Sequence, residues 1–128
     1  MRVVSALIHK NKDILMALRK MNARCPGMWE LPGGKVEQGE SERAALSREC
    51  NEELGVDAIV GQKIAAHTFE FPNEFVDISL YSVILMGIPR PLSSLAIIWT
   101  PLATAVETMT LTPSTYVWAG EIERFINA

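Results

Sequence analysis

The sequence predicts an α+β fold in which a mixed β-sheet carries two main helices. Three observations support this prediction: β-rich segments occur in both halves of the chain, one strongly capped helix separates them, and an amphipathic segment closes the chain. The chain has 128 residues, of which 48% are hydrophobic and 21% charged, as in globular proteins. We therefore expect a single domain spanning residues 1–128.

The N-terminal part of the chain alternates between extended segments and turns. Residues 2–9 and 13–19 are rich in apolar side chains, and the polar residues 11–13 form a turn, so the two segments are predicted to be paired strands. Residues 20–28 contain a Pro-Gly pair and are expected to form a loop. Residues 29–40 hold one proline and three glycines, which indicates a structured loop that begins from a short strand.

The best helix in the sequence lies between Ser41 and Gly55. Ser41 is a good N-cap, Glu42 is favourable in the first turn, and Gly55 is suited to end the helix. Three apolar residues recur every four positions and predict the buried face of this helix: Leu46, Cys50 and Leu54.

The second half of the chain is mainly extended. Residues 58–71 and 75–86 are β-rich, and residues 95–100 are a further strand candidate. Ser114, directly after Pro113, is predicted to cap a final amphipathic helix.

Charge and cysteine content restrict the classes of function. The net charge of −3 offers no basic patch for nucleic acid. Residues 1–5 lack the apolar run of a signal peptide, and Cys25 and Cys50 are expected to be free thiols, so we expect a cytoplasmic protein. Residues 78–106 carry few charges but contain three prolines, which favours buried strands over a membrane span. Because residues 78–106 could also supply a subunit interface, the sequence is compatible with a monomer or a homodimer.

The capped helix carries an unusual concentration of carboxylates. Residues three and four apart share one helix face, so Glu49, Glu52 and Glu53 converge. Such a cluster is unfavourable without a nearby cation, and Mg²⁺ prefers hard oxygen ligands that it shares with phosphates. Arg48 is expected to lie apart from Glu49 and to reach back to Glu40 in a bidentate pair that fixes the loop against the helix.

A solvated helix face is the commoner interpretation of a run such as ECNEEL, but the spacing changes the balance. Seven residues follow the pattern G-x5-E-x7-R-E-U-x-E-E-x-G-U, where U is apolar: Gly34, Glu40, Arg48, Glu49, Glu52, Glu53 and Gly55. With each residue type near one in fifteen, seven fixed positions coincide by chance about once in 10⁸ windows.

This segment resembles the signature of the Nudix hydrolases, which cleave nucleoside diphosphates linked to another group. The flanking segments RVVSALIHKNKDILMALR, WELPGGK and FEFPNEFVDISLYSV, together with the Trp99 region, are similar to the MutT-like branch of that family. The resemblance implies a Nudix-like α/β/α sandwich.

The resemblance also implies roles for the residues of the signature. Glu49, Glu52 and Glu53, with the backbone carbonyl of Gly33, would bind Mg²⁺ or Mn²⁺. Glu53 or Glu49 would orient or deprotonate the attacking water, and Arg48 with Glu40 completes the expected catalytic group.

Several residues other than the seven fixed positions of the signature are expected to bind the substrate. By similarity Arg19 contacts the phosphates, and Lys35 beside the Gly-Gly pair is a second candidate. Candidates to contact the base are Leu31, Phe71, Ser114 and Thr115.

The sequence departs from MutT-like proteins at two positions. Ser93 stands where such proteins often carry a glutamate that reaches the metal. Either the helix glutamates act alone, which we favour, or Glu70 or Glu74 reaches in, or the enzyme is slower. No asparagine occurs near Ser114, so pyrimidine nucleotides or a broader range are at least as suitable as oxidised guanine nucleotides.

The leading hypothesis is a Mg²⁺-dependent pyrophosphohydrolase that converts a nucleoside triphosphate into a monophosphate and pyrophosphate. Alternative substrates with the same chemistry are ADP-ribose, nucleotide sugars and dinucleoside polyphosphates. A non-catalytic nucleotide-sensing module is the alternative from another class, and the joint presence of Glu49, Glu52 and Glu53 argues against it.

Overall fold

The computed structural model describes every residue from Met1 to Ala128 and contains seven strands and four helices. The strands are β1 (Arg2–Lys10), β2 (Asp13–Leu18), β3 (Trp29–Glu30), β4 (Gly33–Lys35), β5 (Ala58–Phe71), β6 (Glu74–Leu85) and β7 (Ala96–Pro101). The helices are α1 (Glu42–Leu54), α2 (Leu102–Thr108), α3 (Pro113–Val117) and α4 (Ala119–Ile126). The predicted strand segments and the capped helix are confirmed, with ends shifted by one or two residues.

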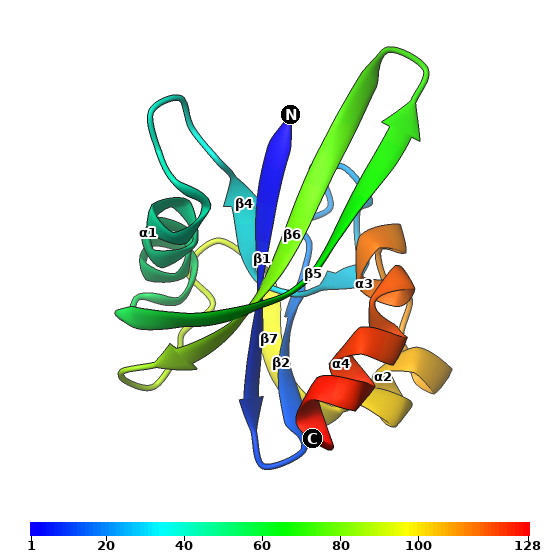
Figure 1. Cartoon of the computed structure of the whole chain (residues 1–128). Helices are drawn as coiled ribbons and strands as arrows, with labels where there is room; N and C mark the ends of the chain where they lie inside the picture. The colour runs from blue at the N-terminus through cyan, green and yellow to red at the C-terminus, as the bar shows by residue number, and fades with distance from the viewer.

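The sheet is mixed, as the sequence predicts. Its strand order is β3-β2-β1-β6-β5, with β4 added to β1 and β7 added to β2. The pairing of β1 with β6 is parallel and every other pairing is antiparallel. Helix α1 covers one side of the sheet, while α2, α3 and α4 gather on the other side (Figure 1). The α/β/α sandwich is therefore confirmed.

Alternation along the strands supplies a core on each side of the sheet. In β1, Val4, Ala6 and Ile8 contribute to the cluster beneath α1, whereas Leu7 points to the opposite cluster. The cluster under α1 contains the predicted helix stripe, and Leu46, Cys50 and Leu54 are at most 1% exposed. The cluster on the other side includes Trp118 and Ile122 from the C-terminal region.

Helix α1 has the ends that the sequence predicts. The Ser41 hydroxyl accepts a hydrogen bond from the Ala44 N–H at 3.1 Å. Gly55 adopts a left-handed conformation with φ of 71°, and its N–H donates to the Asn51 carbonyl. These local contacts fix where the helix begins and ends, and hence which residues face β4.

The C-terminal region differs from the sequence prediction. Helix α2 was not expected, and the predicted final helix is split at Trp118 into α3 and α4. The N-cap of α3 is Thr112 rather than Ser114, and its hydroxyl lies 2.9 Å from the Thr115 hydroxyl instead of capping the backbone. Packing against the sheet, rather than local capping, stabilises these short helices.

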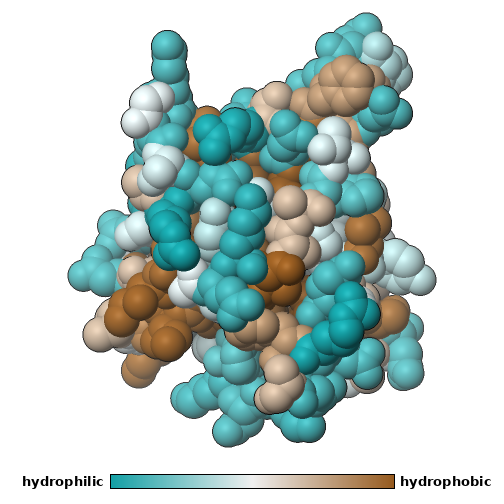
Figure 2. Space-filling model, viewed as in Figure 1, coloured by the Kyte–Doolittle hydropathy of each residue, from teal (hydrophilic) through white to brown (hydrophobic).

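Two surface features accompany the fold. Large apolar side chains are exposed where β5 begins, where β6 ends and in the following loop, including Ile59, Ile84, Met86 and Ile88. One face of the molecule shows apolar patches among polar residues (Figure 2).

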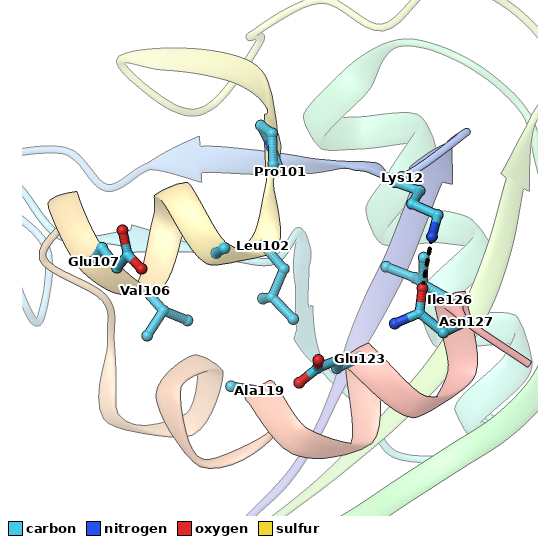
Figure 3. A pocket seen from close by; sticks show the side chains of 10 residues that line it. Lys12, Pro101, Leu102, Val106, Glu107, Ala119, Glu123, Ile126 and Asn127 are labelled. Carbon is cyan, nitrogen blue, oxygen red and sulfur yellow. Dashed lines mark hydrogen bonds between the residues drawn. The ribbon is translucent and has the colours of Figure 1, made fainter.

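A groove of about 520 Å³ lies between α2 and α4, where the Lys12 ammonium donates to the Asn127 carboxamide oxygen at 3.0 Å (Figure 3). None of the predicted site residues lines this groove. No helix has both the length and the apolar character that a membrane span requires.

Candidate active site

The three predicted metal-binding glutamates lie on the C-terminal half of α1, next to β4. Strand β4 is held beside the helix because it pairs with β1, with Gly33 opposite Ser5 and Gly34 opposite Val4. The apolar stripe of α1 faces the core, so Glu49 and Glu53 are held half-buried at the border between helix and sheet. Glu52 is exposed.

The two glycines bring the backbone of β4 against the glutamates. The Gly33 N–H donates to Glu53 Oε2 at 2.9 Å. A Cβ on Gly33 would lie 2.0 Å from the Val4 carbonyl oxygen, and a Cβ on Gly34 would lie 2.3 Å from the Glu49 carboxyl carbon. At Gly33 only glycine fits against the backbone of β1, and at Gly34 a side chain would displace the Glu49 carboxylate from this position.

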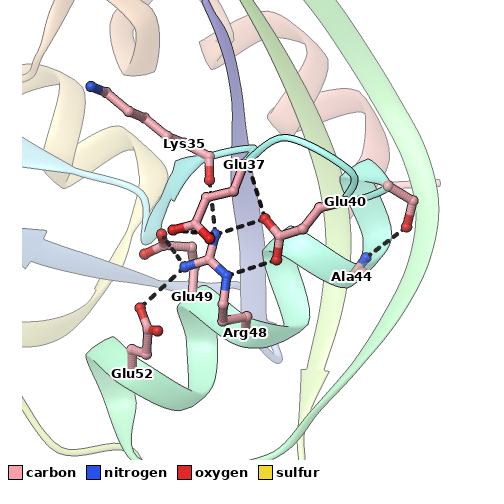
Figure 4. Close-up of polar contacts among 8 residues, drawn as sticks. Lys35, Glu37, Glu40, Ala44, Arg48, Glu49 and Glu52 are labelled. Carbon is pink, nitrogen blue, oxygen red and sulfur yellow. Dashed lines mark hydrogen bonds and ion pairs between the residues drawn. The ribbon is translucent and has the colours of Figure 1, made fainter.

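Arg48 joins the loop after β4 to the helix. Its Nε and Nη2 donate to the two carboxylate oxygens of Glu40 at 2.7 and 2.9 Å, so the predicted bidentate pair is confirmed (Figure 4). Nη2 also donates to the Lys35 carbonyl at 3.0 Å. The hydrogen bonds from Arg48, together with one from the Glu37 N–H, lower the pKa of Glu40 to about 2.

The expectation that Arg48 lies apart from Glu49 is wrong. Its Nη1 donates to Glu49 at 2.9 Å and to Glu52 at 3.2 Å (Figure 4). The side chain is long enough to span the helix turn to Glu52, which is four residues away, and to return to its neighbour. One arginine thus contacts three of the four carboxylates that the sequence singles out.

Burial disfavours the charged forms of Glu49 and Glu53. Burial raises the pKa of Glu53 to about 8, the Gly33 N–H opposes this rise, and the charge of Glu49 adds to it. Burial also raises the pKa of Glu49, against the effect of Arg48. Two half-buried carboxylates that repel each other are a site that a cation would stabilise.

The donor set fits a hard divalent cation. Glu49, Glu52, Glu53 and the Gly33 carbonyl offer only oxygen, which Mg²⁺ and Mn²⁺ prefer. In the structure Glu49 and Glu52 face Arg48 while Glu53 faces Gly33, and no three acidic, His or Cys side chains converge on one point. Binding through all three carboxylates therefore requires Glu49 and Glu52 to turn away from Arg48.

Arg19, the predicted phosphate contact, is paired with a carboxylate that sequence reasoning missed. Its Nη1 donates to both carboxylate oxygens of Glu30, at 3.0 and 2.8 Å. The charges of both residues act on Glu53: that of Glu30 raises its pKa and that of Arg19 lowers it. The sequence placed Arg19 at the end of the second strand and Glu30 in the short strand that follows, but it did not specify the register that brings them together.

The other substrate candidates occupy different surroundings. Lys35 is exposed, and its side chain extends away from the Arg48 cluster (Figure 4). Phe71 lies at the end of β5 and is 46% exposed, with the Arg24 guanidinium 5.7 Å from its ring centroid. Ser114 is half-buried in α3. The structure places these residues around the sheet rather than on α1.

Two candidate base contacts lie in the core. Leu31 is 3% exposed and Thr115 is 4% exposed. Leu31 packs with the cluster beneath α3 and α4, and the Thr115 hydroxyl is occupied by Thr112. Neither side chain offers an open surface to a ligand.

The loop that carries Ser93 is tied to the end of α1. The Leu92 N–H donates to the Glu53 carbonyl at 3.0 Å, and the Arg90 N–H donates to the Leu54 carbonyl at 2.9 Å. Ser93 follows directly and is exposed. This loop therefore brings no carboxylate to the glutamates of α1 at the position of Ser93. Glu74 lies 3.7 Å from Arg24 instead of among the helix glutamates.

Comparisons with known proteins identify the family. The model of the NUDIX domain family matches residues 1–109. The CTP pyrophosphohydrolase of Escherichia coli is 42% identical over 81 residues, which are 63% of this chain and 60% of that protein. A protein named putative 8-oxo-dGTP diphosphatase 2, from Mycobacterium tuberculosis, is 35% identical over 98% of this chain and 89% of its own length.

Solved structures show the same architecture. The solution structure of the E. coli ORF135 protein has a TM-score of 0.87 and 32% identity, covering 97% of this chain and 89% of that one. A MutT NUDIX hydrolase from Burkholderia pseudomallei has a TM-score of 0.84 and 27% identity, covering 94% and 95% of the two chains. With the helix glutamates, the glycine pair and Arg48 arranged as described, the chain belongs to the Nudix family of pyrophosphohydrolases.

Proposed function

We propose that this protein hydrolyses a nucleoside triphosphate to a nucleoside monophosphate and pyrophosphate, with a divalent metal ion as cofactor. The observation that carries the proposal is the joint placement of Glu49 and Glu53 against the Gly33–Gly34 backbone, with Arg48 locked to Glu40 beside them. A protein that only senses nucleotides has no need of this complete set, which argues against the non-catalytic alternative.

The chain's own groups have distinct tasks in the proposed reaction. Glu49, Glu52, Glu53 and the Gly33 carbonyl would hold the metal ion, for which Mg²⁺ is the proposed species and Mn²⁺ an alternative. When bound, the ion supplies neutralisation of phosphate charge and lowers the pKa of a coordinated water. Arg48 keeps the loop after β4 fixed to α1, so that the carboxylates and the backbone stay in one arrangement.

Glu53 or Glu49 would accept the proton of the attacking water. The water oxygen forms a bond to phosphorus as the α–β anhydride bridge breaks, and the proton of the water passes to the carboxylate. Glu53 is the favoured base because its carboxylate is held in place at the border between helix and sheet. The Gly33 N–H fixes one oxygen of Glu53 while the proton is accepted at the other.

For the base, we propose that Phe71 and Ser114 are the contacts that remain accessible. Ser114 has a hydroxyl rather than the paired donor and acceptor of an amide, so it suits a pyrimidine or a broad range of bases. The similarity to a protein named CTP pyrophosphohydrolase supports a pyrimidine triphosphate such as CTP. The similarity to a protein named 8-oxo-dGTP diphosphatase supports an oxidised guanine nucleotide as the second candidate.

The test is product analysis by ion-exchange chromatography. Purified protein meets canonical and oxidised nucleoside triphosphates, ADP-ribose and a nucleotide sugar, with Mg²⁺ or with EDTA. The proposal expects metal-dependent release of monophosphate and pyrophosphate from at least one triphosphate. Cleavage confined to ADP-ribose or the sugar nucleotide would overturn the substrate class, and saturable nucleotide binding without cleavage would establish a sensing module instead.

A further inference from the structure

Glu30 is a half-buried carboxylate that the proposed reaction does not use. Its side chain is 28% exposed, and its charge is near enough to Glu53 to act on it. Each additional negative charge in a site weakens the binding of a polyanionic substrate. The presence of a carboxylate at this point therefore needs a specific physical reason.

The strand pairing explains why Glu30 meets Arg19. Glu30 lies opposite Ala17 in the β2–β3 ladder, and Arg19 is two residues beyond Ala17, so the two side chains are diagonal neighbours on one face. The backbone of Arg19 is fixed as well: its N–H donates to the Met28 carbonyl at 2.9 Å, and its carbonyl accepts from the Gly27 N–H at 3.2 Å.

The guanidinium of Arg19 is held on two of its three nitrogens. Nη1 makes both hydrogen bonds to Glu30, and Nε donates to the Arg24 carbonyl. Nη2 donates to no group of the chain, although the other two nitrogens are engaged. The side chain of Arg19 is 26% exposed, so solvent or a ligand reaches it.

We propose that Glu30 positions Arg19, holding the guanidinium so that Nη2 stays free to donate to a phosphate oxygen of the substrate. This inference rests on the proposed function, because it assigns the phosphate contact of the same site. An arginine loses much rotamer freedom when it binds an anion, and the contact of Nη1 with both oxygens of Glu30 removes part of that freedom in advance. Glu30 is thus a positioning residue, and Arg19 is the group that touches the substrate.

The experiment compares Glu30→Gln, Arg19→Gln and the double variant with the wild-type protein. Glu30→Gln keeps the shape of the side chain but removes its charge and one of the two hydrogen bonds. Electrostatics alone predicts a lower KM for this variant, because the substitution removes a negative charge from a site that binds an anionic substrate. Positioning predicts the opposite, a KM about tenfold higher with kcat within about twofold. The sign of the change in KM therefore separates the two accounts.

The double variant tests whether Glu30 acts through Arg19. The expected result is that Glu30→Gln has no further effect on KM once Arg19 is Gln, since the group to be positioned is gone. An effect of Glu30→Gln that persists in the Arg19→Gln background overturns the inference. So does a loss of Mn²⁺ affinity in Glu30→Gln, measured by electron paramagnetic resonance, because Glu30 would then be a metal ligand.

Glu121→Gln is the matched control, since it removes a carboxylate that pairs with an arginine, Arg124, on α4. It is expected to leave KM unchanged. A calorimetric titration with magnesium pyrophosphate needs no turnover and separates this inference from the proposed function. If the wild-type protein cleaves no triphosphate, the proposed function fails, while the inference still requires Glu30→Gln to weaken pyrophosphate binding about tenfold. Unchanged or tighter binding, or no binding to the wild-type protein, overturns it.

Discussion

Glu53 shows how a single residue is adapted to the proposed chemistry. Its carboxylate is turned toward the Gly33 N–H, close to Glu49, in surroundings that favour the neutral acid. Burial makes the charged form costly for the folded protein when no cation is bound, whereas the proposed base must carry that charge to accept a proton. Function and stability therefore make opposite demands on this residue.

A Glu53→Gln variant separates these demands. Activity is expected to fall by about 10²–10⁴-fold, because the amide cannot accept a proton from water. The unfolding temperature in EDTA at pH 7 is expected to stay equal or to rise, because a neutral side chain replaces a buried acid. Steady-state kinetics and thermal unfolding check the two halves. A variant that is both inactive and clearly less stable contradicts this assignment.

The two glycines are expected to respond differently to alanine. In Gly34→Ala the new methyl group meets the Glu49 carboxylate, a flexible side chain that can move, so the variant should fold but lose activity. In Gly33→Ala the methyl group meets the Val4 carbonyl of the backbone, so the β1–β4 pairing and the folded state should be lost. Circular dichroism together with kinetics distinguishes the outcomes, and equal behaviour of the two variants would refute this explanation of the pair.

The Glu40–Arg48 pair gives a dependence of stability on pH. The folded-state pKa of Glu40 is lowered to about 2 from an ordinary value of 4.5, so its contribution to stability is present above pH 4.5 and is lost as the pH falls toward 2. Glu40→Gln should therefore destabilise the protein at pH 7 and have progressively less effect below pH 4.5. Urea midpoints of both proteins at pH 7, 5, 4 and 3 measure this, and a constant difference would exclude the pair as its source.

At the scale of elements, α1 could be predicted in full because its signals are local. Ser41, Gly55 and the Leu46/Cys50/Leu54 stripe determine its ends and its buried face within one short segment. Helix α2 carries no capping side chain and buries only Ala105, so its sequence lacks the features that identify a helix. Its packing on neighbouring elements is a property of the tertiary structure.

The same distinction applies to the site. The Glu40–Arg48 pair was predictable, because helix geometry and a short loop place it. The expected convergence of Glu49, Glu52 and Glu53 was wrong, because Arg48 holds Glu49 and Glu52 while Glu53 faces Gly33. The Arg19–Glu30 pair depends on the register of β2 with β3, which the sequence does not specify in residues 20–28. The burial of Leu31 likewise depends on tertiary packing, because Leu31 shares its cluster with Trp118 and Ile122 from the C-terminal region.

Trp118, between α3 and α4, tests the importance of this packing. It is 2% exposed, and its indole Nε1–H has no hydrogen-bond partner in the structure. Trp118→Ala should cost about 3–5 kcal/mol of unfolding free energy. Trp118→Phe should cost less than about 1 kcal/mol, because it removes an unsatisfied donor worth about 1–3 kcal/mol while keeping most of the apolar volume. Denaturant unfolding measures both, and a Phe variant as unstable as the Ala variant would indicate a bonded indole.

At the scale of the whole molecule, we propose that residues 1–128 fold as one domain. The family match ends at residue 109, yet the core on that side of the sheet includes Trp118 and Ile122. The backbone of Trp29 also bonds to residues on both sides of Leu111, with its N–H donating to Thr110 at 2.8 Å and its carbonyl accepting from Thr112 at 3.0 Å. The segment between α2 and α3 thus supports the strand that carries Glu30.

At this scale the fold holds one face of α1 against the glycine-rich strand β4, and we propose that this arrangement hydrolyses the α–β anhydride of a triphosphate. The most direct measurement is ³¹P NMR of an equimolar mixture of canonical nucleoside triphosphates and 8-oxo-dGTP incubated with the protein and Mg²⁺. The account predicts growing pyrophosphate and monophosphate resonances, which are absent with EDTA and with Glu53→Gln. Release of orthophosphate with formation of nucleoside diphosphates, or an unchanged spectrum from the folded wild-type protein, would contradict it.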